Sequence, residues 1–357
     1  GNEAIGLGAI AAGCRLMSAY PITPASEIME YLIKKLPKFG GTVVQTEDEI
    51  AAVTMAIGAN YAGVRTMTAS AGPGLSLMME AIGLAGMTET PLVIVDTQRG
   101  GPSTGLPTKQ EQSDLNAMVY GTHGEIPKVV IAPATIEDCF YDMIEAFNVA
   151  EEYQVPVIVM TDLQLSLGKQ SCEPLDYNKI EIRRGKLVSN VPPLEENKLF
   201  KRYAFTEDGV SPRVLPGEKG GLHHVTGVEH DEEGRPNENA VNRRKMMDKR
   251  LSKLNGLRIR DAIRVDAPHE APDLLIIGMG STGGTIDEAR ERLAADGITS
   301  NHITIRQIAP FPAEELKPHI EAAKTVIVIE HNATAQLANQ IKLHVGGADK
   351  IRNVLKY

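Results

Sequence analysis

Glu49 could do chemistry because its ionisable carboxylate stands where a predicted strand ends and a helix begins. It closes the acidic triplet 47–49, which follows the apolar run 42–46, and it opens the helix-forming stretch 49–58. In a parallel α/β sheet such a junction lies at the carboxyl edge of the strands, where ligands bind and helix amide groups attract negative charge. Glu49 is therefore a candidate ligand-binding acid. The alternative is an ordinary acidic residue of a first helical turn.

Arg99 and Thr23 are two further candidates. Arg99 follows the apolar run 92–97 and precedes two glycines. A guanidinium on such a flexible support can bind a carboxylate through two hydrogen bonds, and the alternative is a surface salt bridge. Thr23 precedes Pro24. A Thr-Pro pair predicts a helix N-cap followed by proline at the first helical position.

The elements that must position these residues are short, β-branched apolar runs that alternate with stretches of helical period between residues 4 and 162. The runs cover residues 16–20, 42–46, 65–69, 92–97, 129–132 and 155–162. This alternation predicts a doubly wound, parallel α/β sheet. Helix starts are indicated at the acidic triplet 47–49 and at Thr135, which precedes Glu137 and Asp138. We expect this first domain to span residues 1–165.

Residues 166–260 break the pattern and are predicted to be an irregular linker or interface segment. Prolines and glycine clusters interrupt it, and its length favours a functional or interface role. Its last part is basic, with Arg243, Arg244, Lys245, Lys249, Arg250, Lys253, Arg258 and Arg260. We interpret these cations as a solvated helix face, with an acidic protein partner as the alternative.

Residues 261–357 predict a second, smaller α/β domain. Its expected strands are 274–278, 303–308, 325–330 and one near 352–356, and its expected helices are 285–295, 312–322 and 334–344. The glycine-rich stretch 278–283 superficially fits a dinucleotide fingerprint. However, the next strand leads to Arg306 and not to an acidic residue that could bind a ribose. We therefore interpret the glycines as a tight turn between strand and helix.

Composition excludes several classes of protein. The 357 residues carry 37 Lys+Arg against 46 Asp+Glu, a net charge of −9, which argues against a general nucleic-acid binder. Cys14, Cys139 and Cys172 are too far apart for a zinc motif or a disulfide framework, which indicates a reducing, cytoplasmic setting. No apolar run has the length of a membrane span. The spacing of histidines and acids in 223–233 fits no established zinc site, so no metal is predicted in this chain.

Two motifs resemble the pyrimidine-binding domain of thiamine diphosphate enzymes. Glu49 is followed by Ala51 and Ala52, Gly58 comes nine residues after it, and 70–74 read Ser-Ala-Gly-Pro-Gly. The resemblance implies that Glu49 hydrogen-bonds the aminopyrimidine of the cofactor and acts as the acid/base group, a sound use of a buried carboxylate. Such enzymes usually hold diphosphate and Mg²⁺ through a Gly-Asp-Gly motif, which this sequence lacks. We therefore expect that half of the cofactor site on another polypeptide.

Two longer segments resemble the 2-oxoacid:ferredoxin oxidoreductases: 20–27, Tyr-Pro-Ile-Thr-Pro-Ala-Ser-Glu, and 97–112, which contains Arg99. The resemblance implies that Arg99 binds the 2-oxoacid carboxylate and that the Thr23 hydroxyl contacts the substrate. It implies further pocket and cofactor contacts by Thr104, Thr108, Tyr20, Pro21 and Ile22. The stretch 273–337 resembles the transketolase carboxyl-terminal domain of the same family, which has mainly an assembly role.

The resemblance covers nearly the whole chain and implies an α subunit that acts on a 2-oxoacid, with 2-oxoglutarate the best match. Such enzymes yield acyl-CoA and CO₂ and pass single electrons through iron–sulfur clusters to ferredoxin. Three scattered cysteines cannot hold a four-cysteine cluster. A β subunit is therefore expected to carry the [4Fe-4S] cluster, diphosphate and Mg²⁺ in an (αβ)₂ assembly. In some members of the family a γ-like domain precedes the α region in the same polypeptide.

Lys109 is the expected partner for the second carboxylate of 2-oxoglutarate, because a desolvated charge needs a cation and Lys109 lies ten residues after Arg99. A solvated loop lysine is the alternative. Two other functions stay open for the whole chain: the same family acting on pyruvate or on a branched-chain or aryl 2-oxoacid, and a non-oxidative transketolase-like subunit. An NAD-dependent dehydrogenase is the third alternative, but it would need an acidic residue to bind the ribose, and this sequence has none at that position.

Overall fold

The computed structural model describes residues 1–192, 194–195 and 198–357 and contains two α/β units joined by an irregular segment. The N-terminal unit contains β1 (Leu16–Ala19), β2 (Thr42–Gln45), β3 (Thr66–Ser70), β4 (Leu92–Gln98), β5 (Val129–Ile131) and β6 (Pro156–Asp162). Its helices are α1 (Asn2–Ala11), α2 (Ser26–Lys35), α3 (Glu49–Tyr61), α4 (Gly72–Met87), α5 (Leu115–Tyr120), α6 (Ile136–Tyr153) and α7 (Leu163–Leu167).

The N-terminal sheet has the order β10-β5-β6-β4-β3-β1-β2, in which β10 is Gln307–Ala309, and all of its strands are parallel apart from β10. Buried side chains of α1, α2 and α6 cover one face, and those of α3, α4 and α5 cover the other. This confirms the predicted doubly wound sheet. Because β4 and β6 are buried on both faces, they read as continuous apolar runs rather than as alternating ones.

Local sequence signals start the helices as expected in two places. Asp48 is the N-cap of α3, and its carboxylate accepts a hydrogen bond from the Ala51 amide at 2.7 Å. Thr135 and Asp138 form a reciprocal capping box at the start of α6. The prediction for Thr23 is wrong, because α2 begins only at Ser26, after the N-cap Ala25. The chain turns before the helix, and Thr23 stays exposed on that turn.

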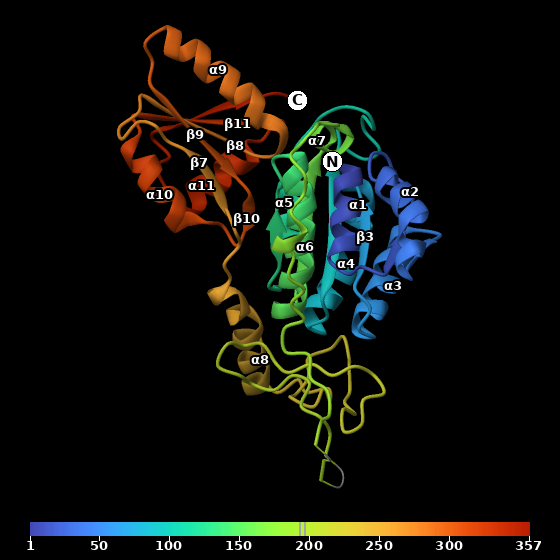
Figure 1. Cartoon of the computed structure of the whole chain (residues 1–357). Helices are drawn as coiled ribbons and strands as arrows, with labels where there is room; N and C mark the ends of the chain where they lie inside the picture. Colours follow the sequence, from blue (N-terminus) through green and yellow to red (C-terminus); the bar gives the residue numbers. More distant parts are fainter. Residues whose placement is uncertain (193, 196–197) are drawn as a thin grey trace.

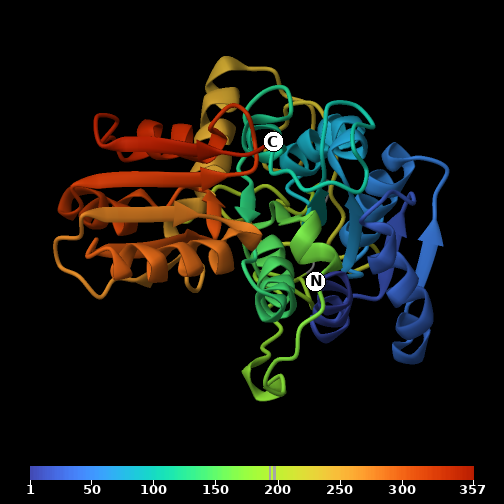
Figure 2. The ribbon, with the colours of Figure 1, turned by 90° about the horizontal axis from the view of Figure 1, so that it is seen from above.

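The second unit has the strand order β12-β11-β8-β9-β7. Its strands are β7 (Ile263–Asp266), β8 (Leu274–Gly278), β9 (Ser300–Ile305), β11 (Thr325–Glu330) and β12 (Ile351–Leu355), and its helices are α9 (Gly283–Ala295), α10 (Ala313–Ala322) and α11 (Gln336–His344). The antiparallel edge strand β7 was not predicted. Figure 2 shows this unit beside the N-terminal sheet.

One expected strand, 303–308, is divided between the two sheets. After β9 ends at Ile305, β10 (Gln307–Ala309) pairs antiparallel with β5 of the N-terminal sheet. One apolar cluster therefore continues from the α3–α5 side of the first sheet into the second unit. The domain limits at 165 and 260 stay a prediction, and β10 shows that the chain after 261 also completes the first sheet.

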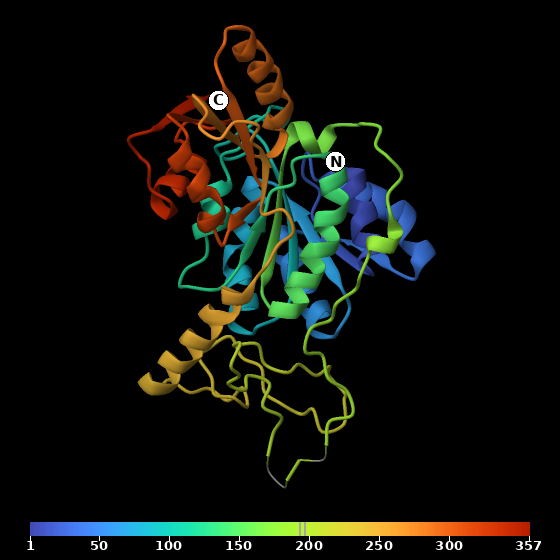
Figure 3. The same ribbon diagram turned by 60° about the vertical axis from the view of Figure 1, so that its left-hand side comes forward.

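The irregular segment first runs from α7 down along α6, where the Asp176 amide donates to Tyr141, and its larger part lies below the amino-terminal edge of the first sheet, opposite α7 (Figures 1 and 3). It ends in α8 (Ala240–Ser252), which carries part of the basic run. The interpretation of that run as a solvated face is wrong for Lys249, Arg250 and Lys253, each at most 5% exposed. Both lysines pair with Glu89 of the α4–β4 connection, at 2.6 Å and 2.5 Å, and Arg250 pairs with Glu229 at 2.7 Å.

Candidate active site

The start of α3 and the start of α4 meet at the carboxyl edge of the first sheet. Glu49 is 6% exposed, and no hydrogen bond or ion pair to its carboxylate is found among the described residues. Gly74 lies against it: a Cβ at this position would come within 2.5 Å of Glu49 Oε1 and would collide with Ser70 Oγ. Only glycine allows this approach, so the two motifs separated in sequence form one site.

The polar groups around this contact fit a nitrogen heterocycle. Ser70 Oγ and Thr68 Oγ1 are buried without a hydrogen-bond partner, on the same side of the sheet as Glu49. Buried polar atoms normally have partners, and orphaned ones indicate a missing ligand or water. An unpaired, nearly buried carboxylate beside them can hydrogen-bond a ring nitrogen and exchange a proton with it. The aminopyrimidine half of thiamine diphosphate therefore fits the residues present.

Arg99 connects the two segments 20–27 and 97–112, which are far apart in the sequence. It is 6% exposed, its Nη1 donates to the Thr23 carbonyl at 2.6 Å, and its Nη2 donates to the Thr104 carbonyl at 3.1 Å. Its Nε is buried without a partner among the described residues. Arg99 is therefore not a surface salt bridge. The structure brings Arg99, Thr23 and Thr104 together and leaves the Nε N–H of the guanidinium for another acceptor.

The loop after Arg99 closes on itself. The Gly100 amide donates to the Lys109 carbonyl at 3.1 Å, and the Gly101 amide donates to Glu111 Oε2 at 2.6 Å. Thr108 and Lys109 are exposed on this loop, and no ion pair is found for Lys109 among the described residues. Tyr20 is 40% exposed, and Pro21 and Ile22 are partly buried at the end of β1. Among the described residues, no hydrogen bond connects Glu49 to the loop residues 108–109 or to residues 20–22.

The second unit holds the far end of this loop through Gln112. The side-chain Nε2 of Gln112 donates to Asp162 Oδ2 at 2.8 Å and to the Met279 carbonyl at 3.1 Å. The backbone amide of Gln112 donates to the His331 carbonyl at 2.7 Å. The Ser281 amide of the glycine-rich turn also donates to Asp162, at 2.9 Å. The turn that resembles a nucleotide fingerprint therefore binds a carboxylate of the chain's own first unit.

Two buried acids near Glu49 were missed by the sequence reasoning. Asp96 in β4 is fully buried, and both of its carboxylate oxygens lack a partner among the described residues. Burial, followed by the nearby charge of Asp114, raises the pKa of Asp96 well above its ordinary value. The one available signal was a lone aspartate inside the apolar strand Leu-Val-Ile-Val-Asp.

Asp114 follows the loop and lies against the start of α4. A Cβ on Gly72 would come within 2.9 Å of both Asp114 oxygens, and Asp114 Oδ2 has no hydrogen-bond partner among the described residues. Burial and the charge of Glu111 raise the pKa of Asp114 to about 6, although the Gly72 backbone and Arg99 oppose the shift. Asp114 and Arg99 both line a cavity of about 440 Å³ between α4, the loop and the second unit.

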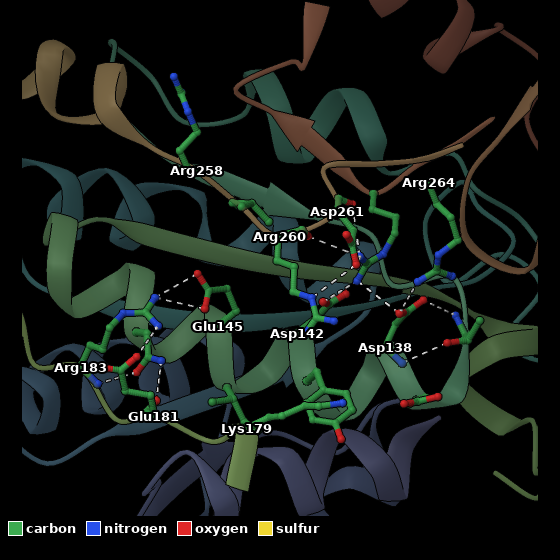
Figure 4. Close-up of a pocket in the computed structure, with 17 residues that line it drawn as sticks. Asp138, Asp142, Glu145, Lys179, Glu181, Arg183, Arg258, Arg260, Asp261 and Arg264 are labelled. Carbon is green, nitrogen blue, oxygen red and sulfur yellow. Dashed lines mark hydrogen bonds and ion pairs between the residues drawn. The ribbon is translucent and has the colours of Figure 1, made fainter. Parts of the chain in front are cut away.

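A second cavity, of about 550 Å³, lies along α6 on the opposite face of the sheet (Figure 4). Its lining is an ion-pair network: Arg306 pairs with Asp142 at 2.6 Å, and Arg264 pairs with Asp138 at 2.7 Å. Figure 4 shows Arg258 pointing away from this network. Because the acids here are matched by arginines from the second unit, we interpret the network as a contact between the two units.

Comparison with known proteins decides the family. Residues 7–249 match the family model described as pyruvate flavodoxin/ferredoxin oxidoreductase, thiamine diphosphate-binding, and residues 272–356 match pyruvate:ferredoxin oxidoreductase core domain II. The chain belongs to the 2-oxoacid:ferredoxin oxidoreductase family. The predicted thiamine-diphosphate domain and the predicted family are thereby confirmed.

Relatives in this family differ in length and in the substrate that their names give. The chain is 40% identical to subunit alpha of 2-oxoacid:ferredoxin oxidoreductase 1 from Sulfurisphaera tokodaii, with 100% of the chain and 58% of the relative aligned. It is also 40% identical to the 2-oxoglutarate synthase subunit KorA from Methanothermobacter thermautotrophicus, over 93% of the chain and 86% of that protein. The chain thus spans little more than half the length of some relatives.

Solved structures confirm the fold. A 2-oxoglutarate:ferredoxin oxidoreductase from Magnetococcus marinus, solved with 2-oxoglutarate, coenzyme A and succinyl-CoA bound, aligns with a TM-score of 0.91 at 39% identity. The alignment covers 100% of this chain and 62% of that one. A split-gene transketolase aligns with a TM-score of 0.55 at 14% identity, which supports the transketolase-like fold of both units and nothing more. No helix in the described parts is long and apolar enough to cross a membrane.

Proposed function

We propose that this family member is the α subunit of a 2-oxoacid:ferredoxin oxidoreductase that interconverts 2-oxoglutarate and CoA with succinyl-CoA and CO₂. Two electrons pass one at a time to ferredoxin in the oxidative direction. The observation that carries the proposal is the contact between Glu49 and Gly74, because it joins the acid and the Gly-Pro-Gly turn into one ligand site. The cytoplasmic setting expected from the unpaired cysteines belongs to the same proposal.

Glu49 would hold the proton that is exchanged with the aminopyrimidine ring. The chemistry that bound thiamine diphosphate would supply here is a nucleophilic carbon and an electron sink for the decarboxylation of the 2-oxoacid. The chain's own contribution is to place Glu49 beside the ring, keep bulk water out and orient the substrate. Arg99 would bind the substrate carboxylate through its free Nε, while its other nitrogens keep it fixed on Thr23 and Thr104. Thr108 and the loop 20–22 would line the same region.

A partner subunit would supply the diphosphate, Mg²⁺ and cluster half of the site. After Glu49, α3 carries no charge, and α4 carries only Glu80, yet both helices expose apolar side chains. Ile50, Met55 and Leu77 are 50%, 40% and 51% exposed. Helices that are apolar on all sides are normally buried, so this surface favours a partner protein.

The cysteines of this chain favour a cluster on the partner. Cys14 and Cys139 are buried, and burial raises the pKa of Cys14 to about 12, so that its thiolate form is disfavoured. An iron–sulfur cluster needs several thiolates together. The [4Fe-4S] cluster and Mg²⁺ are therefore assigned to the β subunit of an (αβ)₂ assembly. Among the described residues, no group of three or more His, Cys, Asp or Glu side chains is placed to hold a metal ion.

Two observations support the proposal of 2-oxoglutarate over other 2-oxoacids. Lys109 is an exposed cation on the Arg99 loop that could reach a second carboxylate. The structure from Magnetococcus marinus, 39% identical to this chain, has 2-oxoglutarate bound. Pyruvate and branched-chain or aryl 2-oxoacids stay the alternatives, since several relatives are named only for a 2-oxoacid.

The function is tested with the purified complex of this chain and its co-purifying subunits. We expect visible iron–sulfur absorbance and CoA-dependent reduction of a one-electron acceptor with 2-oxoglutarate, at a higher kcat/KM than with pyruvate or 2-oxobutyrate. Faster turnover of pyruvate would reassign the substrate. A complex without iron–sulfur absorbance that transfers two-carbon units between sugars would instead support the transketolase-like alternative.

A further inference from the structure

The cavity beside Arg99 carries more acid than base. Its described lining residues include one cation, Arg99, and two acids, Glu111 and Asp114. Asp96 lies close enough for the charge of Asp114 to act on it. A site of this charge would repel an anionic substrate if every carboxyl group were ionised. The raised pKa of Asp96 keeps that group protonated, so the lining carries Arg99 against Glu111 and Asp114, and the proposed binding of a 2-oxoacid at Arg99 is favoured when one of these two acids becomes neutral.

Asp114 is the group placed to do so. Its Oδ2 has no partner among the described residues, and the carboxyl group lies where a Cβ on Gly72 would collide with it. Glu111 is already engaged, because its Oε2 accepts the Gly101 amide at 2.6 Å. Asp96 lies fully buried inside the sheet, away from the solvent.

The titratable groups that face Asp114 are Asp96 from β4, which its raised pKa keeps protonated, and the charged Glu111 and Arg99 from the loop. The remaining lining residues on α4 and the second unit do not titrate: Gly72, Pro73, Ser76, Ala333, Thr334 and Gln336. A ligand carboxylate bound at Arg99 would add a negative charge to this set. It would also cancel part of the Arg99 field that keeps the proton off Asp114.

We propose that Asp114 takes up a proton from the solvent when the carboxylate of a 2-oxoacid binds at Arg99, and that the protonated Oδ2 then donates a hydrogen bond into the cavity. The inference rests on the proposed function, because it assumes that Arg99 binds the substrate. It makes Asp114 a substrate-binding residue, which repels the bound carboxylate when it is ionised and donates a hydrogen bond into the cavity when it is protonated. Near neutral pH, substrate binding is then coupled to proton uptake.

The sign of the pH dependence follows from linkage. The free site begins to lose the Asp114 proton near pH 6, whereas the occupied site keeps it to a higher pH. Binding is therefore tightest below pH 6 and weakens as pH rises above it, by at most about tenfold for each pH unit. At pH 5 the proton is already present, so little uptake accompanies binding.

Calorimetry on the whole complex tests this with 2-hydroxyglutarate, which has both carboxylates but no keto group to react. Comparing buffers of different ionisation enthalpy gives the number of protons bound, which we expect to approach one at pH 7 and zero at pH 5. The variant Asp114→Asn should bind the probe with neither proton uptake nor the loss of affinity above pH 6. The matched control Glu125→Gln, an exposed carboxylate after α5, should behave like the wild type.

A second measurement is the KM for 2-oxoglutarate, which should rise between pH 6 and pH 8 in the wild type and stay level in Asp114→Asn. Turnover without proton uptake, or uptake that persists in Asp114→Asn, would overturn the proposal and leave the proposed function intact. A complex that turns over no 2-oxoacid at all would overturn the proposed function itself.

Discussion

Two buried carboxylates at the amino-terminal edge of the first sheet are each paired with several cations, whereas the three around the candidate site at its carboxyl edge have no ion pair among the described residues. Glu89 lies between Lys249 and Lys253, and Glu151 pairs with Arg65, Arg184 and Arg213. At the other edge Glu49, Asp96 and Asp114 have no such partner.

This difference distinguishes carboxylates that stabilise the fold from carboxyl groups that are available for binding or proton exchange. Burial alone would raise the pKa of Glu89, but Lys253, Lys249 and Arg202 hold it well below its usual range, so this carboxylate is permanently charged. The pKa values of Asp96 and Asp114 are raised instead. Groups that are buried without a partner cost stability and persist where a ligand or a proton uses them.

Glu89→Gln should have the largest effect on stability. The substitution leaves Lys249 and Lys253 buried without a counter-charge, which lowers the free energy of unfolding by about 3 to 5 kcal/mol. Denaturant titration measures it. Glu207→Gln, an exposed carboxylate of the same irregular segment, serves as the matched control and should change the free energy by less than about 0.5 kcal/mol. Equal effects of the two variants would show that the pairing at this edge is not structural.

Glu49→Gln should show the opposite behaviour. Turnover should fall by a factor on the order of 10² or more, because an acid/base group is lost. The unfolding midpoint should change little, since the carboxylate has no partner among the described residues to lose. Glu47→Gln and Asp48→Asn are the controls: Glu47 is exposed, and asparagine caps a helix as aspartate does. Near-normal turnover of Glu49→Gln would remove the acid/base role from this residue.

Lys109→Met tests whether Lys109, on the loop after Arg99, supplies the positive charge that binds the second carboxylate of 2-oxoglutarate. If Lys109 binds the second carboxylate, the variant loses about 1.5 to 3 kcal/mol of transition-state binding for 2-oxoglutarate, and pyruvate is much less affected. The ratio of kcat/KM values for the two substrates measures this. An unchanged ratio would leave Lys109 as a solvated loop residue.

Asp96→Asn should change stability by an amount that depends on pH. Because the pKa of Asp96 is raised on folding, the folded state holds the proton longer than the unfolded chain does, and wild-type stability falls as pH rises above the unfolded pKa of about 4. The asparagine variant has no proton to lose at this position, so its free energy of unfolding does not fall in this way. Relative to the wild type, its free energy of unfolding should rise by up to about 1.4 kcal/mol for each pH unit, until the pH reaches the pKa of Asp96 in the folded state. Denaturation at pH 5 and pH 8 gives the difference, and a pH-independent difference would mean that Asp96 is ionised in the folded state.

The sequence predicted one edge of this sheet far better than the other. Glu49, Gly74 and Arg99 could be found because local motifs identify them, and most strands followed from apolar runs, although β7 and the separation of β10 from β9 did not. Lys249, Arg250 and Lys253 could not be distinguished from a solvated face, because their partners Glu89 and Glu229 lie far away in sequence. Thr23 failed as an N-cap since helix propensity did not reveal the extra turn before Ser26. Asp96 and Asp114 carry no motif, and only tertiary packing shows that they lack partners.

Calorimetry of thiamine diphosphate binding tests the central claim most directly, because the claim is that this chain provides the Glu49 half of a shared site. With Mg²⁺ present, the chain alone should bind the cofactor weakly, and the complex with its partner subunit should bind it tightly. Tight, Mg²⁺-dependent binding to the isolated chain would contradict the account, since it would place the diphosphate and metal sites on this polypeptide.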